Sequence, residues 1–249
     1  MSGGLIVPND LVGWWCPSID ATGGILLDRS GRNNHGTLTN MDPASDWVAS
    51  GKGALDFDGV DDFVNTGNWS NSLTRISVSA WVRPTSGTRQ DFVSKWGSIN
   101  YQYVLLQGVT ASRFQFYIST TSSNAIGSGD STTVISAGVW YHVVGTYDGS
   151  TVRLFINGLL ENSTSHSGNL SASTQNNLIG KSGDALFAGQ LDDVTIFNTA
   201  LTANEVAQVY RLGRGYGVFP EPDLDEGFAA AGFKAYWARR QSQLIGGGV

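Results

Sequence analysis

The chain has 249 residues, of which 41% are hydrophobic, 11% aromatic and 14% charged, and its formal net charge is −6. The hydrophobic content is ample for a buried core and excludes wholesale disorder, while the acidic balance argues against a nucleic-acid partner held through phosphate contacts. The one cysteine, Cys16, excludes an internal disulfide and a cysteine-rich metal site.

The first twenty residues give an expectation about location. Met1 to Asp20 lacks the basic start and the apolar stretch of about 7–15 residues that mark a secretory signal. No run in the chain approaches the roughly 20 apolar residues of a membrane span. We therefore expect a protein that is made in a cytoplasm and has no membrane partner.

Alternation of apolar and polar residues is the main structural signal between residues 54 and 197. In 76–83, for example, Ile76, Val78, Ala80 and Val82 share one face of a strand. Asp148-Gly149 and Asn157-Gly158 are typical of tight hairpin turns, because such turns need positive φ. Many short strands separated by turns indicate an antiparallel sandwich. The predicted strands are 54–58, 62–65, 76–83, 91–96, 101–107, 113–119, 139–147, 151–157, 177–180 and 186–197.

One helix follows the strands. Thr202 and Glu205 have the spacing of a capping box, and Val206 and Val209 then follow at helical spacing until Gly213. This pattern predicts a helix over 202–213 that seals one end of the sandwich.

Several segments of the chain resemble the laminin-G-like, concanavalin A-like jelly-roll family, and together they cover about residues 10–212. The resemblance implies an all-β fold: a concanavalin A-like jelly-roll sandwich of two antiparallel sheets over residues 1–212, followed by a C-terminal extension over 213–249 with a short helix. It also implies ligand sites on a concave face or on rim loops. The same fold carries lectins, adhesion modules and glycanases. The matching segments are 27–38, 54–64, 76–83, 140–149, 152–158 and 187–201.

The resemblance further implies a structural calcium ion (Ca2+). The candidate ligands are Asp28 in the segment Asp-Arg-Ser-Gly and Asp192 or Asp193 in the last predicted strand. Calcium needs 6–8 oxygen ligands, which two carboxylates, loop carbonyls and water can supply. The alternative is that Asp28 forms an Asx-turn while one of the Asp192/Asp193 pair faces solvent.

The sequence gives little support for catalysis. Glycanases of this fold use paired carboxylates on one strand, and the one imitation here is the segment 221–226, Glu-Pro-Asp-Leu-Asp-Glu. Pro222 interrupts the strand that this segment would need, and the start of a helix explains the pattern better. We therefore expect no catalytic residues.

Aromatic residues near strand ends are candidates for carbohydrate binding. Trp69, Trp96, Tyr101 and Tyr103 lie at or near predicted strand ends, where their rings could stack on sugar rings. The alternative for each is a place in the core or under a loop.

The last 39 residues differ from the rest in charge. Residues 1–210 hold 10 Lys and Arg against 17 Asp and Glu, whereas residues 211–249 hold 5 against 4. A short aromatic and basic helix is predicted between residues 228 and 244. Its candidate docking residues are Phe233, Tyr236, Trp237, Arg239 and Arg240.

The segment 235–248 resembles the tails of tailed-phage structural proteins. This resemblance implies a non-catalytic virion protein, most simply a capsid decoration (cement) protein that docks on the major capsid protein or another virion protein through its tail. A virion protein is made in the host cytoplasm, and dimers or trimers of it would suit a symmetric capsid. The alternative is a carbohydrate-binding lectin or adhesion module, in a tail or host-recognition component, that binds host or environmental glycans. A glycanase is the least favoured function.

Overall fold

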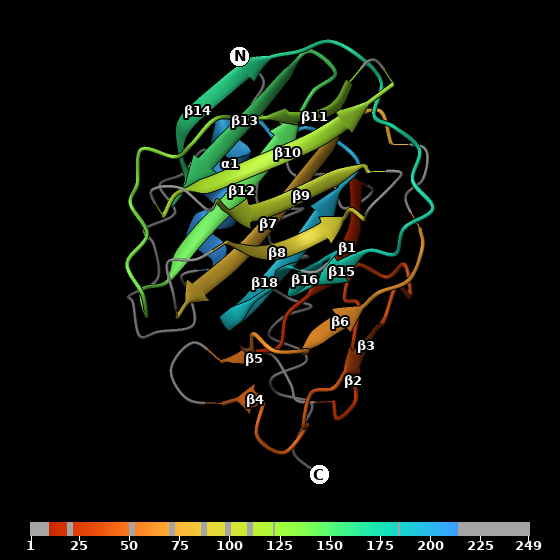
Figure 1. Ribbon diagram of the computed structural model, residues 1–249, viewed down its shortest axis with the longest axis vertical. Coiled ribbons are helices and arrows are strands. Elements are labelled where there is room, and N and C mark those ends of the chain that lie inside the picture. The colour runs from red at the N-terminus through yellow and green to blue at the C-terminus, as the bar shows by residue number, and fades with distance from the viewer. Residues whose placement is uncertain are drawn as a thin grey trace, which may run out of the picture.

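The structure is a computed structural model that describes residues 10–18, 22–49, 53–69, 73–85, 89–97, 101–108, 112–121, 123–183 and 185–213. These residues form strands and one helix, shown in Figure 1: β1 (Leu11–Trp15), β2 (Ile25–Leu26), β3 (Gly36–Thr39), β4 (Trp47–Val48), β5 (Ala54–Asp58), β6 (Phe63–Asn65), β7 (Ile76–Pro84), β8 (Gln90–Lys95), β9 (Tyr103–Gln107), β10 (Phe114–Thr120), β11 (Ser123–Gly127), β12 (Tyr141–Tyr147), β13 (Thr151–Ile156), β14 (Leu159–Ser165), β15 (Leu178–Ile179), β16 (Lys181–Ser182), β17 (Ala185–Leu186), β18 (Ala188–Phe197) and α1 (Ala203–Gly213).

Two large antiparallel sheets make up the fold. Sheet A has the order β14-β13-β12-β7-β18-β5-β4, with β1 also paired to β18. Sheet B has the order β11-β10-β9-β8-β15-β6-β3-β2, and β16 and β17 form a separate hairpin. In Figure 1, sheet B strands such as β9 and β10 lie in front of β7 and β12 of sheet A. The predicted all-β sandwich of two antiparallel sheets is confirmed.

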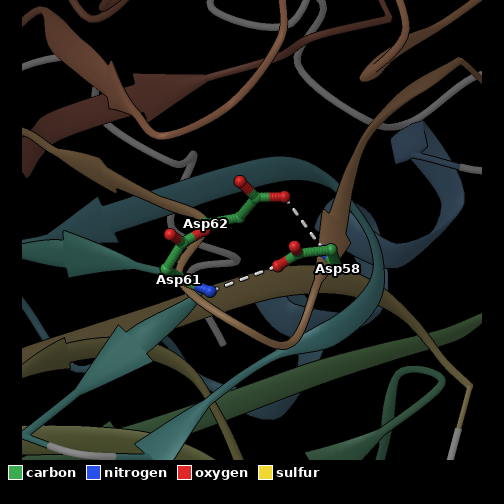
Figure 2. A group of neighbouring side chains, drawn as sticks. All are labelled: Asp58, Asp61 and Asp62. Atoms are coloured by element: carbon green, nitrogen blue, oxygen red, sulfur yellow. Dashed lines mark hydrogen bonds between the residues drawn. The ribbon is translucent and has the colours of Figure 1, made fainter.

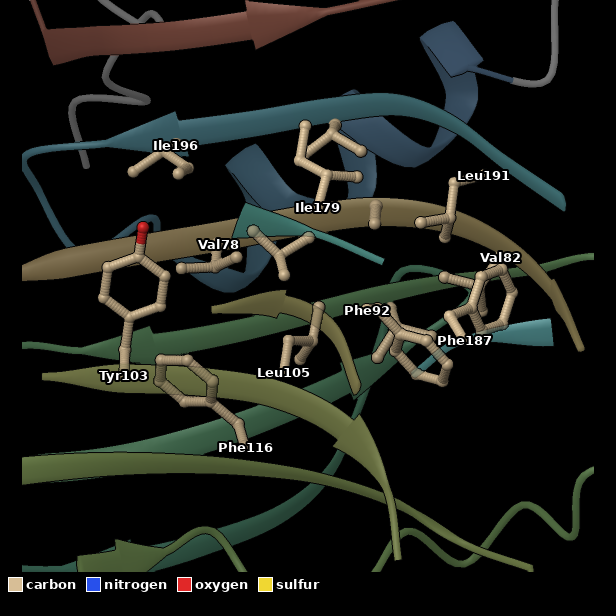
Figure 3. Close-up of a cluster of buried hydrophobic side chains, with 14 of the residues drawn as sticks. Val78, Val82, Phe92, Tyr103, Leu105, Phe116, Ile179, Phe187, Leu191 and Ile196 are labelled. Atoms are coloured by element: carbon tan, nitrogen blue, oxygen red, sulfur yellow. The ribbon is translucent and has the colours of Figure 1, made fainter. Parts of the chain in front are cut away.

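The core lies between the two sheets, as the alternation within the strands predicts. Side chains of both inner faces meet there and are almost completely buried, which removes their apolar surface from water (Figure 3). Gly145 on β12 leaves room for one of them, because a Cβ atom at that position would lie 2.1 Å from Cγ of Phe116. Sheet A contributes Val78, Val82, Leu191 and Ile196, and sheet B contributes Phe92, Tyr103, Leu105, Phe116 and Ile179.

Helix α1 begins as the capping box predicts but packs elsewhere than expected. The Glu205 carboxylate accepts hydrogen bonds from the amide and the hydroxyl of Thr202, at 2.7 and 2.9 Å. Val206 packs in a second apolar cluster with Val144 of β12 and Phe197 of β18, on the outer face of sheet A. The prediction that the helix seals one end of the sandwich is therefore wrong, because the helix covers a face whose apolar residues need burial.

The tail of the chain gives no structural test of its predicted role. The predicted second helix and the docking residues Phe233, Tyr236, Trp237, Arg239 and Arg240 lie outside the described residues. Within the part that the structure describes, no helix is long and apolar enough to cross a membrane.

Candidate functional site

Four segments meet at one end of sheet B and form a surface that we call the rim: residues 66–69, 95–97, 101–103 and 173–177. They meet because β6 ends, β8 ends, β9 begins and β15 begins at the same edge of the sandwich. The pairing of Leu178 with Asn65 on one side and Ser94 on the other fixes this arrangement. Three of the four aromatic candidates for carbohydrate binding lie on the rim with part of their surface exposed.

Lys95 is the structural hub of the rim. Its side chain is fully buried, and its ammonium group donates to Oδ1 of Asn68 at 2.8 Å, to the carbonyl of Trp69 at 2.8 Å and to the carbonyl of Gln175 at 2.9 Å. Among the described residues no carboxylate pairs with it. Burial lowers the pKa of Lys95 to about 8. One ammonium group thus connects three separate segments through neutral oxygen atoms.

Asn177 joins the same segments of the rim as Lys95 does. Its amide nitrogen Nδ2 donates to the carbonyls of Gly67 and Trp69, and its backbone pairs with Thr66 and Gly67. Its Oδ1 accepts the hydroxyl hydrogen of Tyr103 at 2.6 Å. The segments 66–69 and 173–177 are therefore joined by backbone and side-chain hydrogen bonds, and the rim is held in one arrangement.

The stacked pair of Trp96 and Tyr101 is the aromatic feature that the rim presents to solvent. Their ring centroids lie 4.6 Å apart at an interplanar angle of 22°, and both side chains are partly exposed. The Gln175 side chain lies against Gly97, the residue after Trp96, where a Cβ atom would be 2.7 Å from it. Aromatic rings next to amide groups offer both an apolar face and hydrogen-bonding partners to a ligand.

Trp69 and Tyr103 have different environments from this pair. Trp69 is partly buried against the core, 5.8 Å from the Trp15 ring, and its indole nitrogen donates to the carbonyl of Thr66. Tyr103 is fully buried, and burial raises the pKa of its phenol. The assignment of Tyr103 to a sugar-contacting surface is therefore corrected: its ring is core, and it supports the rim through Asn177.

Asp28 organises a turn that precedes all the rim segments in the sequence. Its carboxylate accepts hydrogen bonds from the backbone amides of Trp14, Ser30 and Asn34 and from the Ser30 hydroxyl, at 2.8 to 3.0 Å. The Ser30 amide bond is that of an Asx-turn, so this alternative for Asp28 is confirmed. Because all four groups around the carboxylate are donors, the surroundings of Asp28 do not fit a calcium ion, which needs oxygen ligands.

Asp192 and Asp193 are both buried, although simple alternation would place one of them in solvent. The register between β18 and β7 shifts after Asp192, and Asp193 has a φ of 50°. This β-bulge turns Asp193 toward β1 and Asp192 toward the segment that follows β1. Asp192 accepts from the amide and hydroxyl of Ser18, and Asp193 accepts from the Trp14 indole at 2.7 Å.

The structure draws together a different group of acids. Within the described ranges, Asp58, Asp61 and Asp62 are the only three carboxylates that approach within 4.8 Å of one another, so Asp28, Asp192 and Asp193 form no such group. Figure 2 shows them around the turn between β5 and β6. The Val60 amide, which donates to Asp58, holds the pKa of that carboxyl below its usual value, whereas burial raises the pKa of Asp62.

Sequence reasoning missed both this acidic group and the hub of the rim. The acids at positions i, i+3 and i+4 around Gly59 are visible in the segment Asp-Gly-Val-Asp-Asp, which is a signal for a shared turn. Lys95 carries a weaker signal: it is the one cation of β8 and stands at the end of this strand, all of whose residues are buried. The segment 221–226, considered for catalysis, lies outside the described residues.

The sandwich of two antiparallel sheets with a rim built from loops defines a lectin-like jelly roll of the concanavalin A type. Residues 58–207, more than half of the chain, match the Laminin_G_3 family, described as the concanavalin A-like lectin/glucanases superfamily. The protein therefore belongs to this family. A comparison with curated proteins found no significant match.

Solved structures share this fold at low sequence identity. The receptor-binding domain of botulinum neurotoxin C/D mosaic serotype is 14% identical, with a TM-score of 0.64 over 82% of this chain and 52% of that chain. The botulinum neurotoxin D ligand-binding domain in complex with N-acetylneuraminic acid is 15% identical, with a TM-score of 0.62 over 82% of this chain and 51% of that chain. Domain 4 of the extracellular arabinanase AbnA from Geobacillus stearothermophilus, in complex with arabinotriose, is 20% identical. Its TM-score is 0.61 over 81% of this chain and 98% of that chain. The chain thus spans about half of the neurotoxin domains and nearly all of the arabinanase domain.

Proposed function

We propose that the protein is a carbohydrate-binding, lectin-like module that contacts its glycan through the rim. The observation that carries this proposal is the stacked, partly exposed pair of Trp96 and Tyr101. The C–H faces of sugar rings are apolar and pack on aromatic rings, while their hydroxyl groups need neighbouring hydrogen-bonding partners. The family, and the structures of similar fold in complex with arabinotriose and N-acetylneuraminic acid, support the proposal.

The hydrogen bonds beneath the pair also support a binding role. Lys95 and Asn177 hold the segments 66–69 and 173–177 together at the end of β8, next to Trp96, so little ordering of these two segments is left to occur when a ligand binds. A surface that is ordered in advance loses less conformational entropy on binding. We assign the binding energy to Trp96 and Tyr101, and the geometry of the rim to the groups below them.

We further propose that the protein is not a catalyst. The two glutamates of the described residues have structural roles: Glu161 accepts from the amide of Thr133 at 2.9 Å, and Glu205 caps α1. Neither glutamate belongs to the group formed by Asp58, Asp61 and Asp62. This arrangement supports binding over glycan hydrolysis, which needs two carboxylates on either side of one glycosidic bond.

Replacing Trp96 with alanine is expected to weaken glycan binding at least about tenfold, since a buried aromatic anchor contributes more than 1.4 kcal/mol, roughly a factor of ten. Binding is measured on a glycan array and then by calorimetry with the oligosaccharides that the array selects. Trp96→Phe keeps an aromatic face and is expected to retain most of the affinity.

The matched control for this prediction is Tyr117→Ala on β10, a partly exposed aromatic residue outside the rim. It is expected to bind as the unaltered protein does. Binding that survives in Trp96→Ala would exclude the rim as the contact surface. An array without a single bound glycan would exclude the carbohydrate-binding function itself.

A role as a capsid decoration protein, or as another component of a phage virion, is our second candidate. It is supported by the likeness of residues 235–248 to the tails of tailed-phage structural proteins and by the positive balance of residues 211–249. Deleting residues 214–249 is expected to leave a folded sandwich, measured by circular dichroism, that no longer co-purifies with the particles of the encoding phage. Absence of the full-length protein from those particles would contradict this role.

A further inference from the structure

Apart from Lys95, the rim contains no strong charge. The segments 66–69, 96–97, 101–103 and 173–177 include no Asp, Glu, Lys or Arg, although a chain with 14% charged residues would place about two among these 14 positions. Their ionisable side chains are Tyr101 and Tyr103. Eight of the 14 positions are Ser, Thr, Asn or Gln instead.

The exposed side chains of the rim have the same neutral character. Asn68, Thr174 and Asn176 are exposed, and the partly exposed Gln175 lies against Gly97, the residue after Trp96. The amide of Asn68 donates to the carbonyl of Thr174 at 3.1 Å, which fixes its orientation. The acidic residues gather elsewhere: six aspartates lie between residues 42 and 62.

Lys95, the one cation of the rim, has its hydrogen-bonding capacity used internally. Its three ammonium hydrogens are directed to Asn68, Trp69 and Gln175, and its side chain has no exposed surface. An anionic sugar on the rim would therefore lose water from its carboxylate without gaining a charged partner. Burial of an unpaired charge is costly, so the rim should disfavour such a ligand.

From this we infer that the rim selects uncharged saccharides and discriminates against sugars that carry carboxylate or sulfate groups. The inference rests on the proposed carbohydrate-binding function and names its ligand class. Affinity for such a ligand comes from stacking on Trp96 and Tyr101 and from neutral hydrogen bonds. Because no ion pair forms, the dissociation constant should also be insensitive to salt.

Calorimetry on the full chain with pairs of probes that differ in charge tests the inference. The pairs are lactose with sialyllactose and galactotriose with trigalacturonic acid, the neutral sugar first in each. For any pair in which the neutral sugar binds, the acidic partner is expected to bind at least about tenfold more weakly. The Kd of the neutral sugar should be unchanged between about 20 and 500 mM sodium chloride.

A gain of charge provides the reciprocal variant. Thr174→Lys places a cation on an exposed position of the rim and is expected to raise affinity for the acidic partner by up to about fivefold and to make it salt-dependent. Thr37→Lys, at an exposed position on β3, is the matched control and should change neither affinity.

The outcomes separate this inference from the proposal on which it rests. An acidic sugar that binds the unaltered chain more tightly than its neutral partner, with affinity lost in Trp96→Ala, would overturn the neutral ligand class and leave the rim as the binding site. If neutral and acidic probes bind Trp96→Ala as tightly as they bind the unaltered protein, both the neutral ligand class and the rim as the binding site are overturned. No binding of any probe would also contradict both.

Discussion

Replacing Lys95 with methionine is expected to lower the free energy of unfolding at neutral pH by about 2 kcal/mol. Methionine nearly matches the length of the side chain but donates no hydrogen bond. The substitution leaves the Gln175 carbonyl without its donor, at about 1–3 kcal/mol, whereas water can replace the donor to Oδ1 of the exposed Asn68, and relief from burying the ammonium offsets part of the loss. Urea unfolding followed by circular dichroism measures the difference.

The pH dependence of this difference has a defined sign. The folded chain releases the Lys95 proton at a pKa of about 8, whereas the unfolded chain keeps it until about 10.4. Between these values the unfolded state binds more protons, so the stability of the unaltered protein rises with pH relative to the variant. The difference in unfolding free energy should therefore be larger at pH 9.5 than at pH 7, by about 2 kcal/mol.

Lys181→Met is the matched control. Its ammonium lies 4.4 Å above the Phe63 ring centroid and the residue is partly exposed, so its loss should cost about 0.5–1 kcal/mol. Equal stabilities of Lys95→Met and the unaltered protein, with parallel pH curves, would show that the rim does not depend on the ammonium group.

Asp28→Ala is expected to be the more damaging change, with a loss of about 4 kcal/mol in unfolding free energy. The carboxylate accepts hydrogen bonds from four donors. Its removal leaves the amides of Trp14, Ser30 and Asn34 without an acceptor in a partly or fully buried environment. Asp42→Ala is the control: Asp42 also accepts an amide hydrogen, from Ala44, but in an exposed turn, where water can replace the carboxylate. Its loss should be about 1 kcal/mol or less.

Measuring the same variants in excess calcium and in chelator tests the calcium ion that the family resemblance implies. If Asp28 acts only as a hydrogen-bond acceptor, the loss caused by Asp28→Ala should be equal under both conditions. A loss that grows in the presence of calcium would identify Asp28 as a ligand, because an ion that binds the folded state adds stability in proportion to its occupancy.

Much of the fold could be predicted from the sequence because the central strands follow simple rules. The alternation in 76–83 and the Asn157-Gly158 turn each correspond to a feature of the structure, in β7 and in the β13–β14 hairpin, where both turn residues have positive φ. The missed strands include the two-residue β2 and β4 and also the longer β1, β3, β11 and β14. β2 and β4 are too short to show an alternation, and β14, Leu-Leu-Glu-Asn-Ser-Thr-Ser, lacks the regular apolar alternation of a half-buried strand.

The candidate site was only partly predictable for a related reason. Positions near strand ends correctly suggested that Trp96 and Tyr101 lie on a loop-built surface. Sequence alone could not distinguish them from Tyr103. Tyr101 lies only two positions before Tyr103, yet the Tyr101 side chain is partly exposed and the Tyr103 side chain is fully buried. The role of Asp193 depends on a bulge that breaks the alternation on which the interpretation was based.

The position of β18 has a consequence for how the chain reaches this structure. This late strand lies in the middle of sheet A, between β7 and β5, and also pairs with β1 near the start of the chain. The hydrogen bond between Arg83 and Gln190 spans 107 residues, and that between Trp14 and Asp193 spans 179. Closing loops of this size costs entropy before any contact compensates for it, which makes folding slow. During synthesis, sheet A can be completed only after Phe197 has left the ribosome. Until then the strands that pair with β18, such as β5 and β7, have unpaired edges.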